Sequence, residues 1–402
     1  IAISYACAKA TQVLDHLPDR IVVKASGSII KNVKSVIVPH TNGLKGIEVA
    51  AAAGALYGDA DAKLEVLSNA TRDQIEELPE YVQNTNITVQ HIEQGHVFDL
   101  EINVYYEQEH ASVRIVDTHT NIVQIEKDWK VVFEDKTTNL EHKADHSALI
   151  MKQIWDFSQT VDIDDVKEIL DRQIACNMAI ANEGIHNSYG ANIGHVILNM
   201  DSDCVKTKAK AYAAAGSDAR MNGCELPVVI NSGSGNQGMT VSLPVIVFAD
   251  EWEVSHEKLC RSLVVSNLIA IHQKYYIGSL SAYCGAVSAA CGAGAGITYM
   301  YGGTYQQVSL TIINTLGNIG GIVCDGAKPS CAAKIATSVD AALMAFQLSI
   351  QNKSFLPGEG IIKDDIEETI KSMGYIGRVG MRATDTEILN VMIDRADINE
   401  EC

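Results

Sequence analysis

The sequence predicts an α+β protein, in which a mostly helical core is interrupted by a small α+β insertion with an antiparallel sheet. Two patterns lead to this prediction. Between residues 64 and 133, β-branched residues alternate with polar ones, which is typical of antiparallel strands with one wet face. After residue 145, apolar residues recur at helical spacing instead. We therefore expect a discontinuous core of residues 1–60 and 144–402, with residues 61–143 as the insertion.

The first part of the expected core contains two alanine-rich helices. Residues 1–20 favour one helix and residues 47–56 favour another. Before the second helix lies the polar turn His40-Thr41-Asn42-Gly43-Leu44-Lys45-Gly46. A helix that opens on such a turn presents free N–H groups and a positive dipole end, which suits a carboxylate. An ordinary capped helix explains the same residues equally well.

The insertion is expected to begin with a polar helix, because Thr71-x-x-Gln74 is a capping box; we expect that helix to end at Pro79. Alternating segments follow at residues 87–92, 99–105, 111–116 and 121–125. The histidines of this region lack the spacing of a metal-binding motif, which favours scattered surface residues. We expect a separate folding unit that supplies no metal ligands.

Composition narrows the class of partner. The formal net charge is −19, whereas proteins that bind nucleic acids or anionic membranes usually do so through a basic surface. No apolar run reaches the ~20 residues of a membrane helix, and no charged-then-apolar signal peptide opens the sequence. We expect neither nucleic acid nor a membrane as a partner, and a reducing cytoplasm as the location.

A glycine motif follows in the helical part. Residues 233–238 read Gly-Ser-Gly-Asn-Gln-Gly, a literal G-x-G-x-x-G preceded by a strand-like run. A dinucleotide site would need a helix after the motif and alternating strands and helices around it, but Pro244 follows closely and no such alternation is visible. A backbone nest that binds an anion is the better interpretation. Nearby, Asp218 and Arg220 either bind substrate or form a surface ion pair, and the surface pair is favoured.

Four of the ten cysteines lie between residues 279 and 334, among many glycines and alanines. They are Cys284, Cys291, Cys324 and Cys331. Plain core packing explains any single buried cysteine, and structural zinc prefers closer pairs. A loop that presents two thiolates to a third cysteine from a distant segment is one way to hold an iron–sulfur cluster. Spacing alone supports this only weakly.

Three segments resemble the L-cysteine desulfidase family, which is related to the alpha chain of iron–sulfur L-serine dehydratase. They are residues 232–238, Tyr283-Cys284-Gly285 and residues 328–335. The resemblance implies that Cys284, Cys324 and Cys331 hold a [4Fe-4S] cluster, while Cys291 does not. It also implies that Ser234, Asn236 and Gln237 bind the substrate carboxylate, and Gly235 and Asn42 are further candidates for substrate binding. Lys45 and His40 are candidates for the base because they lie in a patterned turn.

The activity implied by the resemblance is β-elimination: L-cysteine to pyruvate, ammonia and sulfide, or L-serine to pyruvate and ammonia. The expected partner is a small amino acid, with a homodimer as a possible assembly. Three alternatives stay open: a non-catalytic or regulatory protein that binds a small acid, a nicotinamide-dependent oxidoreductase using residues 233–238, and a pyridoxal-phosphate enzyme. The family's Cys-Thr-Glu-Pro motif, expected just before Ile1, is absent from the sequence. Cys402 either fills the fourth iron position or belongs to a frayed tail, and the tail is favoured.

Overall fold

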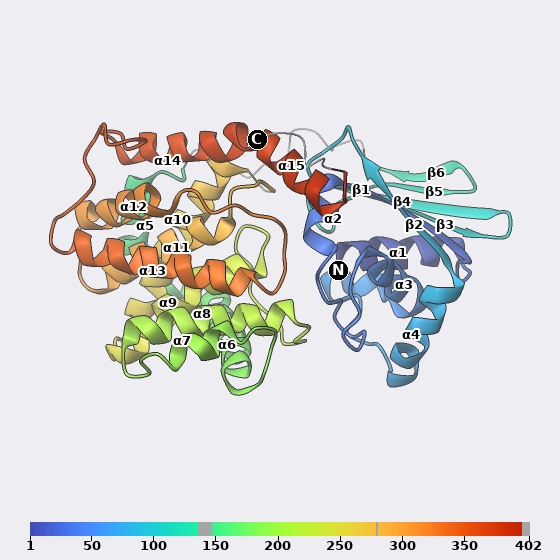
Figure 1. The fold of residues 1–402 in the computed structure, drawn as a ribbon, viewed down its shortest axis with the longest axis horizontal. Coiled ribbons are helices and arrows are strands. Elements are labelled where there is room, and N and C mark those ends of the chain that lie inside the picture. The colour runs from blue at the N-terminus through green and yellow to red at the C-terminus, as the bar shows by residue number, and fades with distance from the viewer. Residues whose placement is uncertain (136–145, 147, 279, 396–402) are drawn as a thin grey trace. The chain divides into compact units, whose positions relative to one another are not determined.

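The computed structural model describes residues 1–135, 146, 148–278 and 280–395 (Figure 1). The chain divides into two compact units. The first comprises Ile1–Ala144, Asp325–Lys328 and Thr386–Cys402, and it contains the sheet. The second comprises Asp145–Cys324 and Pro329–Asp385, and the elements described in it are helical. The predicted α+β class with a mostly helical part is confirmed.

The first unit combines a six-stranded sheet with helices. Its elements in chain order are α1 (Ala2–Leu14), β1 (Arg20–Ser26), α2 (Gly27–Val33), α3 (Ile47–Tyr57), η1 (Ala60–Glu65), α4 (Arg72–Asn84), β2 (Asn86–Ile92), β3 (Asp99–Tyr106), β4 (Glu109–Val116), β5 (Ile122–Lys127) and β6 (Lys130–Glu134). The strand order is β2-β1-β3-β4-β5-β6. Helix α1 packs on β3, β4 and α3. Ile21 and Val23 of β1 and Leu100 and Ile102 of β3 are fully buried and form part of the core.

Strand β1 changes the predicted boundary between the units. It lies between β2 and β3, so that Val23 pairs with Val89 on one side and with Ile102 on the other. The sheet is therefore incomplete without residues 20–26, and residues 1–60 belong to the sheet unit and not to the helical one. The sheet is also mixed, because β1 runs parallel to β2 while the remaining pairs are antiparallel.

Two local details of the first unit correct the sequence analysis. The capping box at Thr71 and Gln74 is present, but α4 continues through Pro79 to Asn84. Tyr81 explains part of this continuation, because its hydroxyl donates to the Pro18 carbonyl at 2.7 Å and this hydrogen bond holds the last turns of α4 against the segment before β1. His110 is buried, not on the surface: its ring stacks on Trp129 with centroids 4.0 Å apart.

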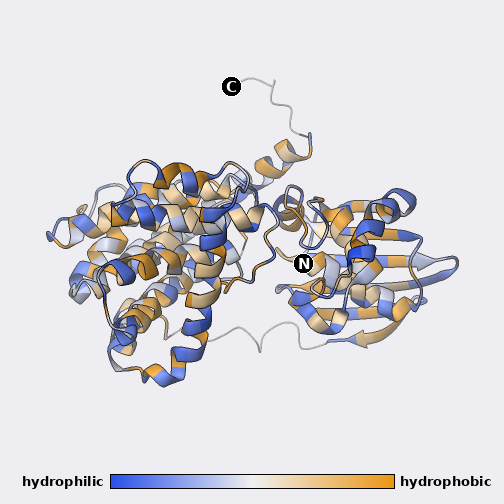
Figure 2. Cartoon of the chain, turned by 90° about the horizontal axis from the view of Figure 1, so that it is seen from below, coloured by the Kyte–Doolittle hydropathy of each residue, from blue (hydrophilic) through white to orange (hydrophobic). Residues whose placement is uncertain are grey.

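The second unit is an assembly of helices. Its elements are α5 (Met151–Thr160), α6 (Ile163–His186), α7 (Ile193–Leu198), α8 (Val205–Met221), α9 (Gly235–Glu251), α10 (His256–Ile277), α11 (Gly285–Met300), α12 (Tyr305–Ile319), α13 (Cys331–Ser349), α14 (Ile366–Tyr375) and η2 (Ile376–Gly380), while α15 (Arg382–Met392) spans the division between the units. Figure 2 shows hydrophobic residues along these helices, interleaved with hydrophilic ones.

Helix α11 is the centre of the second unit. It packs against α9, α10, α12 and α13, and nearly all its residues are buried. Its glycines and alanines allow this close packing: a Cβ at Gly292 would lie 2.4 Å from the Ser266 carbonyl oxygen of α10. The small-residue composition of this segment therefore reflects helix packing as well as the cysteines beside it.

Helix α13 is, among the described helices, the one that is long and apolar enough to cross a bilayer by length and composition. However, 56% of its apolar window is buried inside the fold. Ile335, Val339 and Phe346 of this helix are almost fully buried in the hydrophobic core. We therefore interpret α13 as a core helix.

Candidate functional site

The three predicted ligand cysteines lie at the starts of α11 and α13 and on the segment before α13. Cys284 is the N-cap of α11 and Cys331 is the first residue of α13. Cys324 lies on an extended segment that pairs with the residues before α11, because its N–H donates to the Ala282 carbonyl at 2.6 Å. On the same pair of segments the Cys284 N–H donates to the Ile322 carbonyl at 3.1 Å. Residues 40 positions apart are thereby brought side by side.

The side chains of these cysteines interact directly. The Cys284 thiol is hydrogen-bonded to that of Cys324, and this bond together with burial and the nearby charge of Cys331 raises the pKa of Cys284. The Ala286 N–H at the start of α11 acts in the opposite direction, because it donates to the Cys284 sulfur. Cys284 is buried, and Cys324 and Cys331 are partly buried. Their thiolates would repel each other if all were ionised, so a positively charged centre that they bind would stabilise the ionised forms.

Cys291 lies apart from these three cysteines. It is fully buried within α11, and its thiol points toward the Ile312 carbonyl at 3.9 Å. Burial raises the pKa of this thiol to about 12, although hydrogen bonds with Gln273 and Thr315 oppose the shift. Its surroundings are those of a cysteine in the hydrophobic core.

The 233–238 motif forms a turn that starts α9. Ser234 is the N-cap, and its hydroxyl accepts from the Gln237 N–H at 3.4 Å. Gly233 has a left-handed φ of 78°, and a Cβ at Gly238 would lie 1.9 Å from the Val229 carbonyl oxygen. The glycines are therefore needed for the turn and for close packing.

A dinucleotide-binding unit does not surround this motif. Residues 227–230 form no strand, and the six described strands all belong to the first unit. Contrary to expectation, α9 continues through Pro244 to Glu251. Its buried sides explain why: the packing of Met239, Leu243 and Phe248 outweighs the hydrogen bond that Pro244 cannot make.

The turn lies against the cysteines through two side chains. A Cβ at Gly285, next to Cys284, would lie 2.5 Å from the Gln237 side-chain amide carbon, so that amide packs directly on the start of α11. The Gln237 Oε1 atom is buried and has no hydrogen-bond partner among the described residues. On the other side, Arg220 donates from Nη1 to Asn236 Oδ1 at 3.1 Å.

Arg220 connects the turn to the third cysteine. Burial lowers the pKa of its guanidinium, and the charge of Cys331 acts on it in the opposite direction. A guanidinium remains charged at neutral pH, so this part of the unit carries a fixed positive charge. A surface ion pair between Arg220 and Asp218 was the favoured expectation, and it is wrong because Arg220 donates to Asn236 instead.

Asp218, its supposed ion-pair partner, faces elsewhere. It is 1% exposed and accepts from the Gly194 N–H at 2.9 Å. Burial raises the pKa of this carboxyl to about 6, against the effect of two backbone hydrogen bonds. The spacing contained the signal, because helical residues two positions apart point in different directions.

The remaining predicted residues lie in the first unit. His40 and Asn42 both have left-handed backbones, with φ of 55° and 54°. The turn is a tight hairpin in which the Val38 N–H donates to the Leu44 carbonyl at 2.9 Å and Gly46 caps α3. Asn42 and Lys45 are exposed. Their proposed roles stay predictions, and Cys402 lies outside the described residues.

Comparison with known proteins decides the family. The sequence model described as serine dehydratase alpha chain matches residues 61–390, which is most of the chain. The chain belongs to the serine dehydratase alpha chain family. It is also similar to curated proteins named UPF0597. Identities are 51% over 395 residues to the protein of Lachnoclostridium phytofermentans (98% of this chain, 95% of the relative), 49% over 397 residues to that of Desulfitobacterium hafniense (98% and 92%), and 46% over 397 residues to that of Finegoldia magna (98% and 95%).

The serine dehydratase alpha chain family is associated with iron–sulfur enzymes. The residues of this chain fit such a group: three thiols come from separate segments and interact, and one is hydrogen-bonded at a helix N-terminus. Thiolates are the usual ligands of iron–sulfur clusters. The buried Gln237 Oε1 atom beside Gly285 has no hydrogen-bond partner among the described residues, so it could accept a hydrogen bond from a group bound here.

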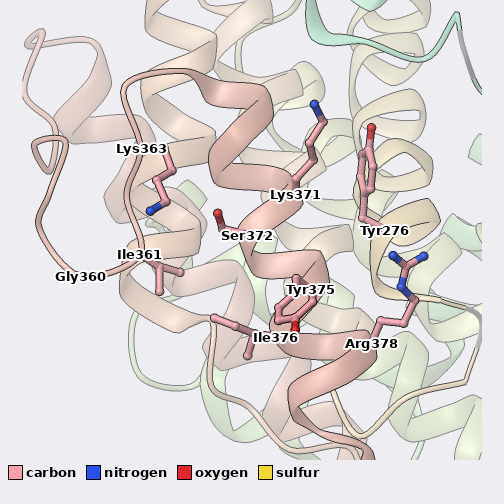
Figure 3. Close-up of a pocket in the computed structure, with 9 residues that line it drawn as sticks. All are labelled: Tyr276, Gly360, Ile361, Lys363, Lys371, Ser372, Tyr375, Ile376 and Arg378. Atoms are coloured by element: carbon pink, nitrogen blue, oxygen red, sulfur yellow. The ribbon is translucent and has the colours of Figure 1, made fainter.

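A separate hollow lies between the end of α10 and α14 (Figure 3). Lys363, Lys371 and Arg378 line it, but in Figure 3 their charged ends point in different directions, and Lys371 is hydrogen-bonded to Glu368 at 3.0 Å. None of the site residues predicted from the sequence lines this hollow. It is not part of the candidate site.

Proposed function

We propose that this protein catalyses β-elimination on a small amino acid, with L-cysteine as the first candidate and L-serine as the second. The products would be pyruvate and ammonia, together with sulfide or water. The observation that carries the proposal is the interacting set of Cys284, Cys324 and Cys331, next to a turn whose Asn236 is held by Arg220. Membership of the serine dehydratase alpha chain family supports the same class of reaction.

The three cysteines would hold a [4Fe-4S] cluster, which when bound supplies a Lewis acid for the leaving thiol or hydroxyl. The substrate carboxylate would be bound at the start of α9, where Ser234, Asn236 and Gln237 lie beside free helix N–H groups. Arg220 adds a positive charge and orients the Asn236 amide.

A base must remove the proton from the substrate α-carbon. Lys45 and His40 remain the candidates, and Asn42 remains a candidate for substrate binding. The proposal includes a homodimeric assembly and a reducing cytoplasmic setting in which the thiols stay available.

The test is to purify the protein without oxygen, measure iron and acid-labile sulfide, and assay pyruvate release from L-cysteine and L-serine. Replacing Cys284, Cys324 or Cys331 by Ala should abolish bound iron and activity. Cys291→Ala is the matched control and should retain both, with a stability loss of about 1 kcal/mol. Bound iron that survives all three replacements would overturn the ligand assignment. Binding of an amino acid without turnover would favour the non-catalytic alternative, and bound nicotinamide or a Schiff-base absorption band would favour the others.

A further inference from the structure

A second group of metal-binding side chains lies between α6 and α10. His256 and Cys260 are four residues apart at the start of α10, so both face the same way. Asp171 of α6 faces them. His256 Nε2 lies 2.6 Å from Asp171 Oδ1, and His256 Nδ1 lies 3.3 Å from Cys260 Sγ. One potential ligand atom from each residue lies within 4.8 Å of the other two.

The group is buried at one end and open at the other. Cys260 is fully buried, whereas the side chains of His256 and Asp171 are 52% and 42% exposed. The thiol therefore forms the base of the site, and the imidazole and carboxylate form its mouth. A metal ion could enter from solvent and keep a water ligand, as open zinc sites do.

Two simpler interpretations explain less of this arrangement. An ion pair accounts for the contact between His256 and Asp171, but not for the buried thiol directed at the other ring nitrogen. A Cys-His-Asp nucleophile would need a thiol that a substrate can reach, and Cys260 is fully buried.

We propose that Asp171, His256 and Cys260 bind one divalent transition-metal ion, and that Zn²⁺ is the ion that fits best. Sulfur, nitrogen and carboxylate oxygen are the three ligand types that zinc uses, in a tetrahedron whose ligand atoms are about 3.5 Å apart. The 3.3 Å separation of the sulfur and nitrogen is close to that value. Asp171 contacts Nε2, on the other side of the ring from Nδ1, so its half-exposed side chain would turn toward the sulfur on binding to become the third ligand. Thiolate and carboxylate together balance the charge of the ion.

The site is independent of the proposed reaction. Its ligands come from two helices, so the metal would fasten the start of α10 to α6. None of its three residues belongs to the set of Cys284, Cys324 and Cys331, and their replacement should leave the basal activity unchanged.

The experiment uses the whole chain, purified without oxygen so that it keeps its native metals. The protein is treated with a mild chelator to remove loosely bound ions and is then equilibrated with Zn²⁺. Wild type should bind one more zinc per chain than His256→Gln or Asp171→Asn, and zinc should raise the Tm of wild type but not of these variants. The half-exposed positions of both residues make these replacements compatible with folding. Co²⁺ in place of zinc should produce a thiolate charge-transfer absorption that Cys260→Ser removes.

The matched controls are Cys176→Ser and His186→Gln, which lie on α6 outside the site and should bind zinc as wild type does. Two results would overturn the proposal. In one, wild type gains no zinc at micromolar concentrations. In the other, His256→Gln and Asp171→Asn bind as much zinc as wild type, which would locate the metal at other cysteines.

Discussion

Replacing Arg220 with Met tests the connection between the 233–238 turn and the cysteines. The change removes the guanidinium that donates to Asn236 Oδ1 at 3.1 Å while keeping much of the side-chain volume. A hydrogen bond from a charged donor contributes about 1.5–3 kcal/mol. If that interaction orients the carboxylate site, KM for the amino acid should rise about 10- to 150-fold. The value of kcat should change much less, because Arg220 is proposed to bind and position the substrate.

The assay is the initial rate of pyruvate release, measured without oxygen over a range of amino-acid concentrations. Arg220→Lys should recover part of the loss, since it keeps the charge but not the planar fork. Lys210→Met is the matched control on the same helix: Lys210 forms an exposed ion pair with Asp340 at 2.7 Å, and its loss should leave KM unchanged. An Arg220→Met enzyme with the KM and kcat of wild type would refute the reasoning.

Two further predictions concern stability. Gly238→Ala places a Cβ 1.9 Å from the Val229 carbonyl oxygen and should lower the free energy of unfolding by about 2–3 kcal/mol. The control is Gly321→Ala, whose Cβ would enter open space and which should lower the free energy of unfolding far less. Equal midpoints of urea unfolding for the two variants would contradict the packing argument. Burial alone would raise the pKa of Glu367, but the hydrogen bond with His272 holds it below the usual value. The ionised carboxylate therefore stabilises the fold above about pH 4.3, and this contribution is lost as the pH falls through the lowered pKa. Glu367→Gln should show a smaller loss of stability on acidification than wild type in urea titrations.

The Asn236 amide can be tested in the same way. Asn236→Ala should raise KM, and it should have little effect on folding because the side chain lies in a partly exposed turn. Circular dichroism melting checks the fold, and initial rates check the binding. Unchanged kinetic constants would remove the carboxylate site from residues 233–238.

The local sequence determined much of the secondary structure. The capping box at Thr71 and Gln74, the alternation in β3 and β4 and the glycine turn before α9 all depend on residues close in the chain. Such patterns act through hydrogen bonds and side-chain spacing within a few residues, so they can be recognised without a structure. The candidate cysteines were also visible as a cluster in the sequence.

Tertiary structure decided what depends on distant partners. The membership of β1 in the sheet follows from its parallel pairing with β2, whose residues lie 66 positions further along the chain, and no local pattern encodes that pairing. Burial determined that α9 continues through Pro244, because the packing of a buried helix outweighs one lost hydrogen bond. The approach of Cys324 to Cys284 and the contact of Arg220 with Asn236 arise for the same reason: both join segments that meet only after the helices have packed.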